Sequence, residues 1–134
     1  MLFRSINPCD AWVSDNARVY GNAWVYDDAW VYDNARVYGD ARVYGNARVS
    51  GNAWVCGDAK VYGDESLLWV SKIGSRHGTT TFFRTKIGIS VTCGCFHGTV
   101  EDFEKKVRET HGENEHAQAY MLAINLAKLR IKID

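Results

Sequence analysis

The segment from Ser66 to Val100 carries the side chains best suited to binding a small molecule. It contains no Asp or Glu. Its cations are Lys72, Arg76, Arg84 and Lys86, and its histidines are His77 and His97. Hydroxyls and aromatic rings lie among them, including Thr80, Ser90, Thr92, Phe82 and Phe96. Arginine binds phosphate and carboxylate through two parallel hydrogen bonds, and aromatic rings stack on bases. This composition favours a site for a small anionic, nucleotide-like ligand.

Strand alternation sorts these residues into faces. Residues 87–96 predict one strand whose core face carries Ile87, Ile89, Val91, Cys93 and Cys95. The opposite face carries Gly88, Ser90, Thr92 and Gly94, which are small enough to leave room for a ligand. The strand at 79–85 places Thr80, Phe82, Arg84 and Lys86 on one face that would line the same space.

The predicted ligand-binding set combines these strands with the glycine-rich loop at 74–78. Its members are Arg76, His77, Thr80, Phe82, Arg84, Lys86, Ser90, Thr92, Phe96 and His97. The alternative is a solvated pair of basic strands in which threonine serves β propensity alone.

The sequence Cys93-Gly-Cys95 with His97 raises two further chemistries. Thiolate and imidazole bind zinc, but structural zinc sites use a second ligand pair and the wider Cys-x2-Cys spacing. A catalytic alternative would use His77 or His97 as general base, or Cys95 as nucleophile. We expect core thiols instead, with no metal, no cofactor and no catalytic residue.

Nine uninterrupted hexads run from Ala11 to Asp64, each with Ala first and Val third. Ala and Val of each hexad share one strand face, while Trp, Arg or Lys and then Tyr, Ser or Cys share the other. Gly or Asp followed by Asn or Asp supplies a corner.

This pattern resembles the hexapeptide-repeat family, whose chains wind as left-handed parallel β-helices. The resemblance implies three hexads per coil and therefore about three coils. Hexapeptide acyltransferases and gamma-class carbonic anhydrases carry their functional histidines on or between coils. This chain has no His before His77 and no insertion between hexads. We therefore expect the repeat to be a scaffold.

Outward residues of successive coils should stack in columns. The columns are Trp12, Trp30 and Arg48; Arg18, Arg36 and Trp54; Trp24, Arg42 and Lys60; Tyr20 and Tyr38; and Tyr26, Tyr44 and Tyr62. The four Trp and six Tyr of these hexads would expose more apolar surface to water than a soluble monomer usually does. Packing between subunits would cover them, and we favour a trimer. Alternatively, the C-terminal segment folds back over them, or they form a surface on which bases or sugars stack.

Residues 65–134 form a different unit. Strands are predicted at 68–73, 79–85 and 87–96, then a helix capped by Thr99 and ended by Gly112. A second helix at 114–132 carries Tyr120, Met121, Ile124, Leu126 and Leu129 as expected core. The predicted fold is mainly β: a β-helix at 1–64 as oligomerisation scaffold, and an α+β ligand-binding module of three strands and two helices at 65–134.

Composition and charge limit the partners and the cellular location that we expect. The 134 residues have zero net charge, which disfavours duplex nucleic acid as a partner. We find no signal peptide or long apolar run, and Cys9, Cys56, Cys93 and Cys95 lack disulfide spacing, so a cytoplasmic protein is expected.

The predicted function is a non-catalytic homo-oligomer that sequesters its ligand. In overall plan it resembles phage proteins that sequester nucleotide immune signals, which would make it an anti-defence sponge. One alternative is a hexapeptide-family transferase or hydrolase with its site in the C-terminal module. Another is a protein–protein inhibitor or structural protein that uses the aromatic surface.

Overall fold

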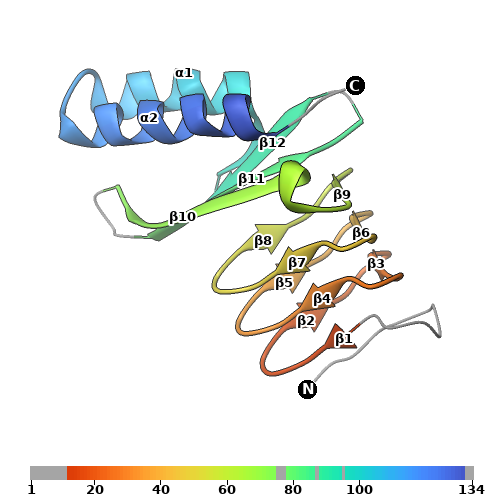
Figure 1. Ribbon diagram of the computed structural model, residues 1–134. Coiled ribbons are helices and arrows are strands. Elements are labelled where there is room, and N and C mark those ends of the chain that lie inside the picture. The colour runs from red at the N-terminus through yellow and green to blue at the C-terminus, as the bar shows by residue number, and fades with distance from the viewer. Residues whose placement is uncertain (1–11, 75–77, 87, 95, 132–134) are drawn as a thin grey trace.

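The hexads wind into a three-sided parallel β-helix, as the repeat predicts (Figure 1). The computed structural model describes residues 12–74, 78–86, 88–94 and 96–131. Within them each hexad supplies one two-residue strand: β1 (Trp12–Val13), β2 (Arg18–Val19), β3 (Trp24–Val25), β4 (Trp30–Val31), β5 (Arg36–Val37), β6 (Arg42–Val43), β7 (Arg48–Val49), β8 (Trp54–Val55) and β9 (Lys60–Val61). They form the sheets β1-β4-β7, β2-β5-β8 and β3-β6-β9. The prediction of about three coils is confirmed.

The first and third residues of the hexads fill the interior of the β-helix. The alanines from Ala17 to Ala59 and the valines from Val19 to Val61 are at most 1% exposed. The fifth residue of each of the first eight hexads adopts left-handed backbone, with φ from 57° at Asp15 to 71° at Gly39. Some corner carboxylates also brace the next coil, since the N–H of Gly51 donates to Asp33 Oδ2 at 3.2 Å.

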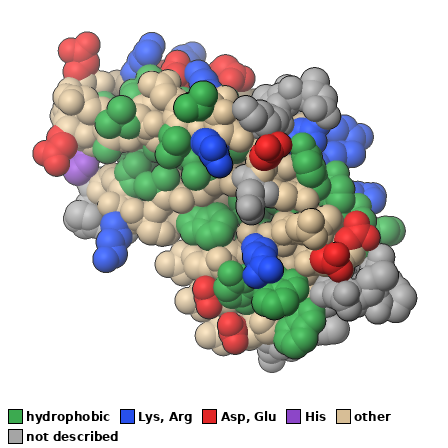
Figure 2. Space-filling view, in the orientation of Figure 1, with side chains coloured by type: hydrophobic (Ala, Val, Ile, Leu, Met, Phe, Trp, Pro, Cys, Tyr) green, Lys and Arg blue, Asp and Glu red, His purple; other side chains and the backbone are tan. Residues whose placement is uncertain are grey.

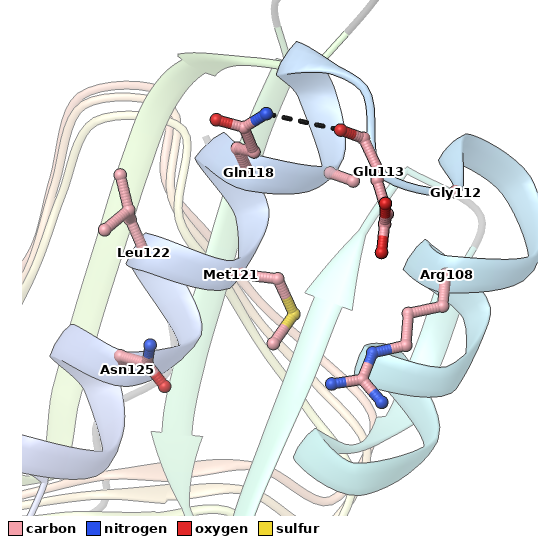
Figure 3. A pocket seen from close by; sticks show the side chains of 8 residues that line it. Arg108, Gly112, Glu113, Gln118, Met121, Leu122 and Asn125 are labelled. Atoms are coloured by element: carbon pink, nitrogen blue, oxygen red, sulfur yellow. Dashed lines mark hydrogen bonds between the residues drawn. The ribbon is translucent and has the colours of Figure 1, made fainter.

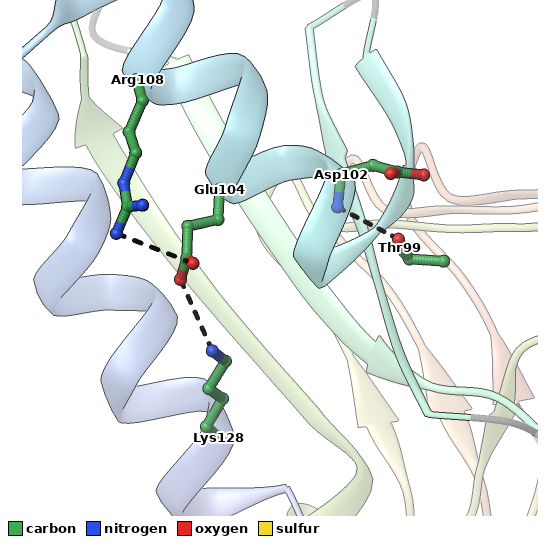
Figure 4. Close-up of polar contacts among 5 residues, drawn as sticks. All are labelled: Thr99, Asp102, Glu104, Arg108 and Lys128. Atoms are coloured by element: carbon green, nitrogen blue, oxygen red, sulfur yellow. Dashed lines mark hydrogen bonds and ion pairs between the residues drawn. The ribbon is translucent and has the colours of Figure 1, made fainter.

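The C-terminal module is an antiparallel sheet with two helices on one face (Figure 1). A short turn of 3₁₀ helix (Asp64–Ser66) leads into β10 (Leu67–Ile73), β11 (Gly78–Arg84), β12 (Ile89–Cys93) and β13 (Phe96–Thr99), followed by α1 (Val100–His111) and α2 (Glu115–Arg130). Thr99 caps α1 as predicted, because its Oγ1 accepts the N–H of Asp102 at 3.1 Å (Figure 4). Gly112, at φ 62°, ends the helix.

The module has four strands in its described part, where three were predicted. Gly94 divides the expected 87–96 strand, since its φ of 58° turns the chain and Cys93 pairs with Phe96 across a tight hairpin. Ile87 and Cys95 lie outside the described residues.

The sheet caps the last coil of the β-helix. Phe83 and Leu67 join the Ala and Val residues of the β-helix in one core. Ile73, Phe82 and Val91 contribute instead to a second core beneath the helices. The sheet therefore lies between two apolar cores, with one face of β11 contributing to each.

Helix α2 departs from its predicted burial. Tyr120 and Ile124 are buried as expected, but Leu126 is 43% and Leu129 is 70% exposed. The prediction that these two leucines belong to the core is wrong, because α2 turns a different face, with Ala123 and Ala127, to the sheet. Neither α1 nor α2, nor any other described helix, is long and apolar enough to cross a membrane.

Candidate functional site

The register of β11 and β12 divides the predicted ligand-binding residues between two faces of the sheet. Thr80 pairs with Cys93 and Phe82 with Val91, whereas Thr92 pairs with Thr81 and Ser90 with Phe83. Directly paired residues of an antiparallel sheet share a face. The expectation that Thr80 and Phe82 line one space with Ser90 and Thr92 is therefore wrong.

Several members of the predicted set make structural contacts. On the helix side, Thr80 Oγ1 donates to Cys93 Sγ at 3.2 Å, and Phe82 is fully buried against Phe103. The ring of Phe96 lies 5.3 Å from that of Phe103. On the β-helix side, Thr92 is buried and its Oγ1 donates to the carbonyl of Trp54 at 2.9 Å.

The Trp54 peptide receives from the sheet the partners that a further coil would have supplied. Its N–H donates to Thr81 Oγ1 at 3.1 Å, and its carbonyl accepts from Thr92. The hydroxylated face predicted to admit a ligand therefore packs on the β-helix. Hydroxyls on this side of the sheet form hydrogen bonds with backbone groups at the open end of the last coil.

Replacing Thr92 by Val is expected to lower the free energy of unfolding by about 1 to 3 kcal/mol, because a buried carbonyl loses its donor while the shape is kept. Thr79→Val is the matched control, since its hydroxyl bonds to Ser71 in solvent, and it should stay within about 0.5 kcal/mol of the parent. Urea unfolding curves measure both. Equal values for the two variants would contradict the role given to Thr92.

Two accessible members of the set, Arg84 and Lys86, lie where the sheet meets the last coil. Ala59 and Thr85 form an antiparallel bridge, so the register places Lys60 opposite Arg84. Lys86 follows and is exposed. We call Lys60, Tyr62, Arg84 and Lys86 the rim.

The remaining predicted residues lie elsewhere. Ser90 is half-buried on the β-helix side, and His97 is exposed on β13, where its Nε2 would lie 3.1 Å from a Cβ added at Gly57. Arg76 and His77 lie outside the described residues.

A ladder of tyrosines leads along the β-helix to the rim. The rings of Tyr26 and Tyr44 stack at 5.2 Å, those of Tyr44 and Tyr62 lie 6.0 Å apart, and Arg84 Cζ lies 5.1 Å from the Tyr62 ring centroid. Burial raises the pKa of Tyr44, and Tyr26 adds to the rise while Arg84 opposes it. The Tyr44 hydroxyl therefore stays protonated at physiological pH, and the ladder ends at the arginine.

Each of the three sides of the β-helix stacks an arginine against a tryptophan. Arg42 lies 4.7 Å from the ring of Trp24, Arg48 lies 4.6 Å from Trp30, and Arg36 lies 5.0 Å from Trp54. The exposed fractions are 57% for Trp12, 44% for Trp24, 38% for Trp30 and 37% for Trp54. Figure 2 shows such hydrophobic and basic side chains side by side over the β-helix. Because the module stacks on the end of the β-helix, its described residues leave these columns uncovered.

The described cysteines are buried or half-buried. Cys56 occupies an outward tyrosine position of the repeat, and its side chain is buried there, with 3% exposed. Burial raises the pKa of its thiol, and a hydrogen bond with Tyr38 opposes the rise.

Cys93 packs beside the helical core, 3.8 Å from Tyr120 Oη, and burial raises the pKa of Tyr120 to about 12. Cys95 lies outside the described residues. Among those residues, no group of three or more His, Cys, Asp or Glu is placed to hold a metal ion.

The sequence of the hexads is similar to one known family of repeats. Residues 11–27, 29–43 and 41–57 match the YdcK β-solenoid repeat. The N-terminal half is similar to that repeat. No curated protein and no solved structure matches the chain. The matched residues all lie in the β-helix, so the family resemblance concerns the scaffold alone.

Proposed function

We propose that this protein is a non-catalytic homo-oligomeric binder that sequesters a small anionic, nucleotide-like molecule at the rim. The observation that carries the proposal is the placement of Lys60 opposite Arg84, beside the ring of Tyr62. A phosphate between these two cations would accept charge-assisted hydrogen bonds from both.

The rim also offers selectivity for a ligand that is both charged and aromatic. Arg84 lies over Tyr62, so its planar guanidinium is held for bidentate contact with a phosphate. Lys86 adds a third, exposed cation. The tyrosine ladder adds aromatic surface beside these cations, which a base could contact.

The homo-oligomer is proposed from the tryptophan–arginine columns. Tryptophan, tyrosine and arginine are enriched in protein interfaces, and here they cover the β-helix as self-similar rows. Side-by-side packing of β-helices would bury part of this surface, and we favour a cytoplasmic trimer.

Calorimetric titration with adenosine diphosphate tests the rim. We expect Arg84→Ala and Lys60→Ala each to weaken binding about tenfold or more, since each removes a charge-assisted contact. Lys105→Ala, an exposed cation on α1, is the matched control and should bind as the parent does. Thermal unfolding checks that the variants remain folded, and Arg84→Lys tests the bidentate geometry. Parent-like affinity in a folded Arg84→Ala variant would contradict the rim assignment.

Native mass spectrometry of gently purified protein tests sequestration itself. A protein that sequesters its ligand should co-purify with it and release it chemically unchanged after heat denaturation. An enzyme should release product instead. The exposed columns favour one alternative function, a protein–protein inhibitor or structural protein, which would bind no small molecule.

A further inference from the structure

Helix α2 carries a second apolar face that points away from the sheet. Leu122, Leu126 and Leu129 are 71%, 43% and 70% exposed, and Ala119 is partly exposed. Their spacing of three, four and three residues is the a/d pattern of a helix that packs against another helix. Such a narrow seam is distinct from the broader face that α2 buries under the sheet.

A groove runs beside this seam between α1 and α2 (Figure 3). Its volume is about 850 Å³, and its lining includes Arg108, Gln118, Met121, Leu122 and Asn125. Arg108 stays near the groove because it pairs with Glu104 at 3.8 Å, and Glu104 also contacts Lys128 at 3.5 Å (Figure 4). An apolar groove with polar edges can accommodate a row of side chains from a neighbouring helix.

We propose that α2 of a second copy of this chain packs antiparallel on this seam about a two-fold axis. In that arrangement Leu122 of each copy lies opposite Leu126 of the other, and Ala119 lies opposite Leu129. These are the a-to-d layers of an antiparallel helix pair, with two large pairs in the centre and a small residue facing a large one at each end. The seam is therefore self-complementary, as a two-fold contact requires.

Charge along α2 agrees with the antiparallel direction. The helix begins at Glu115 and has Lys128 and Arg130 in its last turn. Antiparallel packing brings the Glu115 end of one copy near the Arg130 end of the other, and it sets the two helix dipoles in opposition. Parallel packing would place like charges side by side at both ends.

The contact predicts an even number of chains. If β-helices also associate as trimers, as the proposed function holds, the two-fold axis joins two trimers into a hexamer; without that contact it gives a dimer. The two proposals can therefore fail separately, because ligand binding at the rim and β-helix packing need no α2 contact.

Site-specific cross-linking tests the direction of packing. Asn125 lies beside the two-fold axis, so Asn125→Cys should form a reducible cross-linked dimer under mild oxidation. Gln118 borders the same groove, but antiparallel packing separates its two copies by about 18 Å at 1.5 Å per residue, so Gln118→Cys should not cross-link. The parent chain controls for its own cysteines. Cross-linking of both variants, or of neither, would overturn the antiparallel pair.

Mass measurement by light scattering tests the seam. The parent should contain an even number of chains, and Leu122→Glu with Leu126→Glu should halve its mass, because four carboxylates would face one another. Both leucines are exposed in the single chain, so folding should survive, and circular dichroism checks this. Lys106→Glu on the exposed side of α1 is the charge-change control. A parent with one or three chains, or a variant of unchanged mass, would contradict the two-fold contact between copies of α2.

Discussion

Gly45→Ala is expected to lower the free energy of unfolding by about 3 kcal/mol or more, since it combines backbone strain with a steric clash. Gly45 has a φ of 62°, which a residue with a side chain rarely adopts. A Cβ at this position would collide with the carbonyl oxygen of Tyr62 in the next coil. The corner cannot easily move aside, because the Gly45 N–H donates to Asp27 and its carbonyl accepts from Asp28.

Two other glycines separate the two causes. Gly112 has the same φ of 62° but no atom within 4 Å of the added Cβ, so Gly112→Ala should cost about 1 kcal/mol. Gly78 has neither feature, and Gly78→Ala should change stability by less than about 0.5 kcal/mol. Urea unfolding of the three variants gives the comparison. If Gly45→Ala costs no more than Gly112→Ala, the spacing between coils relaxes more easily than the close contact implies.

The β-helix could be predicted in detail because its information is local and repeated. Every hexad contains its own strand and corner, and the residue that it contacts lies 18 positions away in an identical context. Stacking of Tyr20 on Tyr38 follows from that period alone, and the rings lie 5.1 Å apart. The exception is Cys56, which is buried and hydrogen-bonds with Tyr38, whereas the tyrosines at the same position of other hexads stay partly exposed.

The module was predicted less well because alternation assigns faces within a strand but does not fix register. Thr92 was correctly separated from Val91, yet nothing local showed that Phe82 would share a face with Val91. A hydroxylated face also has two uses, and here it bonds to the peptide of Trp54. The turn at Gly94 was missed because the apolar alternation continues through it.

The rim could not be predicted from either half of the chain. Lys60 and Tyr62 belong to the last hexad, where they look like any other outward pair of the repeat. Their neighbours Arg84 and Lys86 come from β11 and the residues that follow it. The bridge between Ala59 and Thr85, and the contact of Arg84 with Tyr62, bring the two pairs together. That Arg84 and Lys86 bind a ligand stays a prediction, and the rim gives it a specific place.

Phe83→Ala is expected to lower the free energy of unfolding by about 3 to 5 kcal/mol, because a fully buried ring leaves a cavity. Phe83 is the largest module side chain in the core that also contains Val55 and Val61 of the last coil. Its removal should loosen the last coil first. We expect faster amide hydrogen exchange across residues 48–62, measured by mass spectrometry of peptides, before the helices are affected.

Phe82→Ala is the matched control, since its ring is equally buried one residue away on the opposite face of β11. It should cost a similar amount but raise exchange in α1 and α2, whose residues Phe103 and Ile124 share its core. Identical exchange patterns in the two variants would show that the sheet transmits each defect to both sides. Distinct patterns would mean that the capping face and the helical face of the sheet are separately cooperative, so the β-helix end can open while the helical core stays folded.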